Sequence, residues 1–131
     1  MAMSPQVRLH ILVVTAVLAV FVSCDSSQPK PAPGGGSLPA ELQAGEAKFN
    51  AHCSACHGQR GVGTPQGPPL VHKIYEPNHH SDATFQRAAA MGVRAHHWEF
   101  GNMPKIDGVT PADVDQMIQY VRWLQRQAGI F

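Results

Sequence analysis

The chain has 131 residues, of which 44% are hydrophobic and 15% charged, and its formal net charge is +1. This length accommodates one domain of ordinary size and excludes a multidomain enzyme. Ten lysines and arginines stand against nine acidic residues, so the chain lacks the concentrated basic charge of a nucleic-acid-binding protein. We therefore expect no nucleic-acid partner.

The N-terminal segment has the composition of a secretory signal. Residues 11–22 carry no charge, and Thr15 is the only one among them that is not apolar. A helix needs roughly 20 apolar residues to span a bilayer, so this shorter run fits the apolar region of a signal peptide. The alternative is a short helix buried in the core.

The end of this segment indicates where the signal is cleaved. The residues Phe21-Val22-Ser23-Cys24 resemble the cleavage box of bacterial lipoproteins, although Phe21 stands where leucine is usual. In such a box the cysteine becomes the lipidated first residue of the mature protein. We predict a signal peptide over residues 1–23 and lipidation of Cys24, with plain secretion as the alternative.

A flexible tether is predicted after Cys24. The stretch Pro29-Lys30-Pro31-Ala32-Pro33 favours extended polyproline geometry, and Gly34-Gly35-Gly36 restores flexibility. At about 3 Å per residue, this segment could reach roughly 40 Å from a membrane. The predicted organisation is therefore a lipidated cysteine and tether over residues 24–39, followed by one folded domain over residues 40–131.

A helix is predicted from about residue 39 or 40 to residue 52. Leu42, Gly45 and Phe49 are spaced three and four apart, so they share one helix face. A glycine inside a helix costs about 1 kcal/mol relative to alanine. A close crossing by another helix at Gly45 would explain this residue.

The segment Cys53-Ser54-Ala55-Cys56-His57 is the attachment motif for c-type haem. Two thiols at this spacing can add to the two vinyl groups of one porphyrin edge, and the adjacent His57 can then bind the iron through Nε2. A redox disulfide between Cys53 and Cys56 and half of a zinc site are the alternatives. No further cysteine pair completes a zinc site.

A shorter helix is predicted from residue 81 or 82 to residue 91. Phe85, Ala88 and Ala89 give it a small apolar face, and Gly92 ends it.

The last predicted helix begins at Thr110. This residue is a good N-cap, Pro111 suits the first helical position, and Asp113 adds negative charge to the first turn. Gly129 ends the helix. An apolar stripe of helical period consists of Val114, Met117, Ile118, Val121 and Leu124.

Taken in order, these features resemble the small single-haem class I cytochromes c. The resemblance covers residues 40–131 and depends on the haem motif, the loop Gly67-Pro68-Pro69-Leu70 and the segment Gly101-Asn102-Met103-Pro104 between the first and last helices. It implies an all-α fold in which three or more short helices and long loops surround one haem c, attached through Cys53 and Cys56. It also implies an electron carrier and not an enzyme.

The resemblance assigns the sixth iron ligand to Met103. A methionine in a Gly/Asn loop before proline matches the family's second ligand in type and order. Met117 falls on the apolar stripe, and Met91 is expected to pack at the end of the middle helix. The alternative places Met103 near the haem edge, with a histidine or water on the iron.

Other haem contacts also follow from the resemblance. Pro68, or else Pro69, supplies the carbonyl that accepts a hydrogen bond from His57, and Leu70 touches the ring. Candidate donors to the haem propionates are Tyr75, Arg94 and Trp98. Trp98 could instead pack near the loop that carries Met103.

Two histidine pairs, His79-His80 and His96-His97, are not explained by the motif. They could form a copper or zinc site or a proton-linked switch. Because adjacent residues usually point apart, we expect at most one of each pair to reach a common centre. Surface or propionate-linked imidazoles are the main alternative, and an axial role for His96 or His97 is another.

The functional expectation is a monomeric electron carrier, lipid-anchored on the periplasmic side of a bacterial membrane. It would exchange electrons with a redox donor and a redox acceptor in brief encounters, because its charge is nearly neutral. One alternative is a haem-based sensor or peroxidase-like enzyme with a labile sixth ligand. Another is a haem subunit of a larger redox complex.

Overall fold

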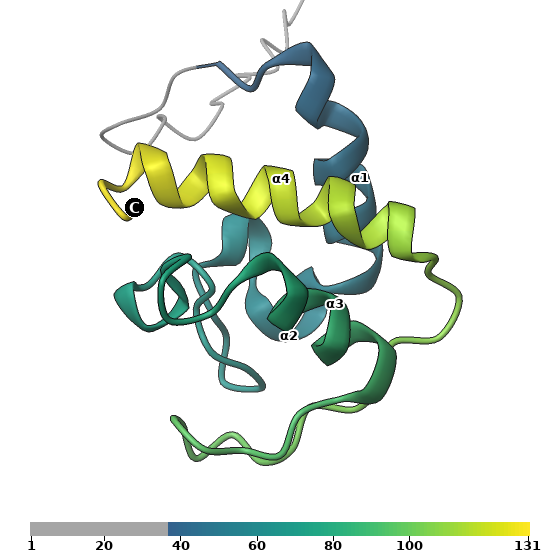
Figure 1. Ribbon diagram of the computed structural model, residues 1–131, viewed down its shortest axis with the longest axis vertical. Coiled ribbons are helices and arrows are strands. Elements are labelled where there is room, and N and C mark those ends of the chain that lie inside the picture. Colours follow the sequence, from purple (N-terminus) through teal and green to yellow (C-terminus); the bar gives the residue numbers. More distant parts are fainter. Residues whose placement is uncertain (1–36) are drawn as a thin grey trace, which may run out of the picture. The chain divides into compact units, whose positions relative to one another are not determined.

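The computed structural model describes residues 37–131, so the predicted signal peptide, Cys24 and most of the tether lie outside the described part. The α-helices of this part are α1 (Gln43–His52), α2 (Ser54–His57), α3 (Asp82–Met91) and α4 (Pro111–Gln127) (Figure 1). Short 3₁₀ turns are η1 (Ala40–Leu42), η2 (Gln59–Gly61) and η3 (Lys73–Tyr75). Residues 37–131 form isolated β-bridges but no strand, which confirms the all-α class. None of the helices described is long and apolar enough to cross a membrane.

The helix ends lie where the capping residues predict them. Thr110 caps α4, and its side chain and that of Asp113 each accept a hydrogen bond from the other's backbone N–H. Gly92 follows α3 with a φ of 77°, and Gly129 follows the end of α4 with a φ of 74°. The predicted first helix is also confirmed, with η1 as its first turn.

Helices α1 and α4 cross in direct backbone contact at Gly45 (Figure 1). A Cβ atom at this position would overlap the carbonyl oxygen of Gln116 and lie 3.3 Å from the Cβ of Tyr120. The rings of Phe49 and Tyr120 pack beside the crossing, with centroids 5.6 Å apart. The predicted close crossing is therefore present, and it explains why a glycine occupies the middle of α1.

The core lies along α4. All five residues of the predicted apolar stripe are buried, as are Tyr120 and Trp123. Leu42 of η1, Phe49 of α1 and Leu70, which follows η2, complete the cluster of buried apolar side chains. One face of α4 thus packs on α1 and the other faces the interior of the domain.

We predict that Gly45→Ala destabilises the protein by about 1–3 kcal/mol, because an added methyl group overpacks a backbone contact that cannot relax without separating the helices. Chemical denaturation followed by circular dichroism measures this change in the free energy of unfolding. Ala47→Gly on the exposed face of α1 is the control, and it should cost about 1 kcal/mol through helix propensity alone. Stabilisation by Gly45→Ala would show that the two backbones are not in contact.

Candidate haem site

An open, largely apolar cavity lies between the helices. Its space between atoms is about 1290 Å³, counted with the mouth that opens to solvent. Apolar side chains from α1, α3 and α4 line it, among them Phe49, Phe85, Ala88, Val114, Met117 and Ile118. The apolar faces predicted for α3 and α4 therefore line the same cavity.

Both cysteines of the motif line this cavity as free thiols. The backbone N–H of Cys53 donates to the carbonyl of Phe49 at 2.8 Å, so α1 runs almost directly into the motif. The Sγ of Cys53 lies 3.6 Å from the Sδ of Met117 on α4. Burial, together with the nearby Cys56, raises the pKa of Cys53 to about 11. Reactive cysteines have lowered pKa values, so the shift at Cys53 is opposite to that of a reactive thiol.

His57 is held in one orientation. Its Nδ1 lies 2.8 Å from the carbonyl oxygen of Pro68, so a proton on Nδ1 is donated to that oxygen and the lone pair is left on Nε2. The hydrogen bond predicted for this loop is present, and Pro68 rather than Pro69 supplies the acceptor. Burial lowers the pKa of His57, and the Pro68 bond opposes this shift only in part. The imidazole is therefore neutral and ready to bind a metal.

Met103 lines the same cavity from a different segment. Val93 and Met103 exchange two backbone hydrogen bonds of 2.9 Å, which close the loop of residues 94–102 at its base. Gly92 makes this pairing possible, because a Cβ atom there would lie 2.5 Å from the carbonyl oxygen of Met103. Met91, expected to pack, is instead 76% exposed and lies outside this cavity, because α3 ends there.

The remaining predicted contacts divide into two groups. Leu70, Tyr75 and Trp98 line the cavity, whereas Arg94 is exposed and lies outside its lining. Burial raises the pKa of Tyr75, and the nearby indole N–H of Trp98, which does not reach hydrogen-bond geometry, lowers it by less. His80, His96 and His97 also reach the lining.

The indole of Trp98 tests whether a prosthetic group fits here. Within residues 37–131 its Nε1 is a buried donor without a hydrogen-bond partner, and such a donor costs stability unless something accepts from it. An apolar group with acidic substituents would fill the cavity and accept this bond. The paired thiols and the oriented imidazole on the wall would hold the same group.

The helical fold, together with the two thiols and the imidazole that line the cavity, defines a protein that holds a large, covalently attached prosthetic group. The family comparison specifies the group: the profile named Cytochrome c matches residues 42–125, and the chain belongs to the Cytochrome c family. No curated protein and no solved structure gives a significant match. Members of this family bind haem c through cysteine thiols, which Cys53 and Cys56 provide here. The chain is thus a haem c electron-transfer protein.

Arg122 supports the site from α4 and was not identified in the sequence. It is 7% exposed, and its guanidinium donates to the carbonyls of Tyr75 and His80 and to the carboxylate of Asp82. Gln125, which is 1% exposed, accepts from Arg122 and donates to the carbonyl of Tyr75. These bonds fix the segment between η3 and α3 against α4.

A sequence signal for this pair does exist. Arg122 and Gln125 lie four and seven residues after Ile118, which places them on the buried face of α4. Polar residues at apolar positions indicate buried hydrogen bonds.

We predict that Arg122→Leu destabilises the protein by about 2–3 kcal/mol, because it leaves the buried carbonyl of His80 without its donor. The measurement is the free energy of unfolding in urea. The control, Arg126→Leu, removes the same charge from an exposed position one turn later and should change stability by less than about 0.5 kcal/mol. Equal effects of the two substitutions would contradict a specific role for the buried guanidinium.

Proposed function

We propose that the protein carries single electrons and that its haem iron is bound by the Nε2 of His57 and the thioether of Met103. The observation that carries this proposal is the oriented imidazole of His57, hydrogen-bonded to Pro68 in a cavity that Met103 also lines. Bound haem c supplies a reversible one-electron iron couple.

The role of Pro68 is to orient the imidazole. Its carbonyl holds the ring of His57 in a single tautomer and makes Nε2 a stronger donor. A fixed ligand moves little when the charge on the metal changes. This rigidity suits rapid electron exchange.

Met103 would complete the coordination. A thioether is a soft, neutral donor that favours the reduced state and so raises the reduction potential. With His57 it would leave no position open for a substrate. This closed arrangement supports electron transfer over a sensor or peroxidase-like activity, which requires a labile Met103.

The polar substituents of the haem need donors at the cavity edge. Trp98 offers a buried N–H without a protein partner, and Tyr75 lines the same cavity. We assign these two side chains to the propionates and Leu70 to an apolar contact with the ring. Arg94 is left out of this set because it lies outside the cavity lining.

The location and partners complete the proposal. Lipid on Cys24 would anchor the domain on the periplasmic side of a bacterial membrane, and residues 24–39 would let it reach a redox donor and a redox acceptor. Nearly balanced charge favours brief encounters by a monomer over tight assembly. The exposed side of the motif at Cys56 is the proposed contact surface.

We predict that the ferric protein shows the weak near-infrared charge-transfer band of sulfur bound to haem iron, and that Met103→Ala abolishes it. The same substitution should lower the reduction potential by on the order of 100 mV, because axial ligands set haem potentials over a range of about 0.8 V. It should also open the ferrous iron to carbon monoxide. Absorption spectroscopy and a redox titration measure these changes.

Met91→Ala is the control, because it removes an exposed methionine outside the cavity and should leave band and potential unchanged. A native protein without the band, or one that binds carbon monoxide as fast as Met103→Ala, would favour the sensor or enzyme alternative.

We further predict that Cys24→Ser moves the protein from the membrane fraction to the soluble periplasmic fraction. Serine lacks the thiol to which the lipid would be attached, and its hydroxyl cannot replace that thiol. Fractionation of cells and metabolic labelling with a fatty acid report the change. Ser26→Ala, two residues further on, should leave the protein in the membrane, whereas membrane retention of Cys24→Ser would contradict the anchor.

A further inference from the structure

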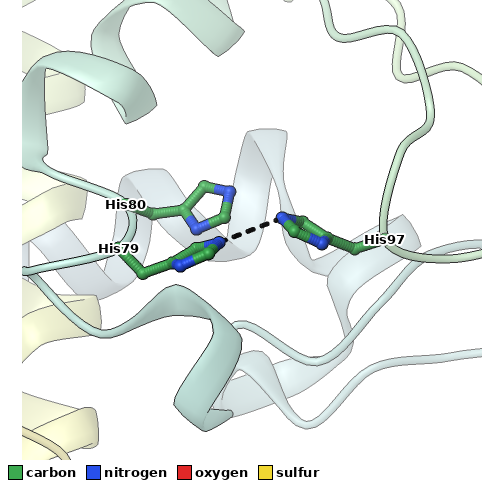
Figure 2. A group of neighbouring side chains, drawn as sticks. All are labelled: His79, His80 and His97. Atoms are coloured by element: carbon green, nitrogen blue, oxygen red, sulfur yellow. Dashed lines mark hydrogen bonds between the residues drawn. The ribbon is translucent and has the colours of Figure 1, made fainter.

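Three imidazoles gather at the rim of the haem cavity, separate from the residues assigned to the haem. His79, His80 and His97 each present a ring nitrogen, and these nitrogens all lie within 4.8 Å of one another (Figure 2). The first two come from the turn before α3 and the third from the loop closed by Val93 and Met103. We call these three residues the histidine cluster.

The two adjacent histidines converge because they lie in a turn. The backbone N–H groups of His79 and His80 both donate to the carbonyl of Glu76, at 3.0 and 2.8 Å. This geometry places their rings on the same side, with centroids 4.7 Å apart. The expectation that at most one member of each pair reaches a common centre was therefore wrong for this pair, because it assumed an extended backbone.

His80 is held like a metal ligand. It is 8% exposed, and its Nδ1 lies 2.6 Å from the carbonyl oxygen of Ile74. A proton on Nδ1 satisfies this contact and leaves the lone pair on Nε2. Metal-binding histidines are usually oriented by such a bond to a backbone carbonyl. The guanidinium of Arg122 also fixes this residue, because it donates a hydrogen bond to the backbone carbonyl of His80.

The spacing of the other two nitrogens also suits a metal. The Nε2 atoms of His79 and His97 lie 3.3 Å apart (Figure 2). Two nitrogens bound tetrahedrally at about 2.0–2.1 Å from zinc are separated by about 3.3 Å. His96 packs beside His97, with ring centroids 4.2 Å apart, but its nitrogen does not belong to the group.

Two of the three imidazoles, those of His80 and His97, have lowered pKa values. Burial lowers the pKa of His80 against the opposing Ile74 bond, and the neighbouring imidazoles lower it further. Partial desolvation by its neighbours, and then the adjacent imidazoles of His96 and His79, lower the pKa of the exposed His97. Neutral imidazole is the form that binds metals.

We infer that the histidine cluster binds one late first-row divalent transition-metal ion, with solvent at the remaining position. A set of three nitrogens without a carboxylate selects zinc or copper over magnesium or calcium. His79 and His97 are exposed, so the ion can enter from solvent without unfolding. This metal site is additional to the haem iron, and it rests on the proposed function in one respect, because His97 is free to bind the ion only when Met103 and not His97 is the sixth iron ligand.

The test is titration of Zn²⁺ into the full-length, haem-loaded ferric protein, prepared without a polyhistidine tag. Zn²⁺ is redox-inert, so the haem keeps its oxidation state. We expect one ion per chain by calorimetry and native mass spectrometry, and no binding of Mg²⁺. His79→Gln and His97→Gln should each weaken Zn²⁺ binding at least about 10-fold. Loss of a residue that only hydrogen-bonds to a metal ligand already lowers metal affinity about 10–100-fold, so loss of a ligand should cost at least as much. Both residues are exposed, so these variants should fold.

His96→Gln is the matched control, because it removes an exposed imidazole beside the cluster and should change the affinity by less than about 3-fold. Absence of stoichiometric Zn²⁺ binding would overturn the proposal and favour imidazoles bound to the haem propionates. Unchanged affinity in His79→Gln and His97→Gln would overturn it equally. A loss in His96→Gln as large as in His97→Gln would overturn the assignment of the three ligands.

Discussion

The backbone contact between α1 and α4 at Gly45 is the constraint on which the rest of the domain depends. Helix α1 continues into Cys53, so the crossing determines where the thiols lie. Helix α4 presents Met117 to the haem cavity, and a turn further on it presents Arg122 to the segment that carries His80. Because Gly45 has no side chain, α4 can pack against α1 in a position where it both lines the cavity and supports the segment at its rim.

The features predicted correctly from the sequence are those encoded by neighbouring residues. Helix ends depend on capping side chains and on glycine conformations within a few residues, so Thr110 and Gly92 mark them in the sequence. The haem motif combines chemistry and spacing within five residues, and the loop containing Pro68 matches a known family pattern. The crossing at Gly45 could be predicted because a glycine inside a helix requires an explanation.

The features that were missed depend on residues far apart in the chain. Arg122 and Gln125 are buried only because carbonyls from Leu70 to His80 return to α4, and no local pattern indicates where those carbonyls lie. The convergence of His79 and His80 depends on a turn at Glu76 and on a loop that comes later in the chain. Met91 is likewise exposed because α3 ends at this residue, and its neighbours in the sequence do not indicate this.

The backbone pair between Val93 and Met103 has a consequence for motion. It closes a loop that carries the indole of Trp98 and the imidazole of His97, and Met103 itself forms the base. Rupture of two hydrogen bonds would release these side chains together, so the loop is a candidate for a single cooperative opening unit. Any ligand that binds only the closed loop must lower the population of the open form. An ion on His97 and an iron on Met103 would then reinforce each other through the shared cost of closing one loop, without any contact between the two metals.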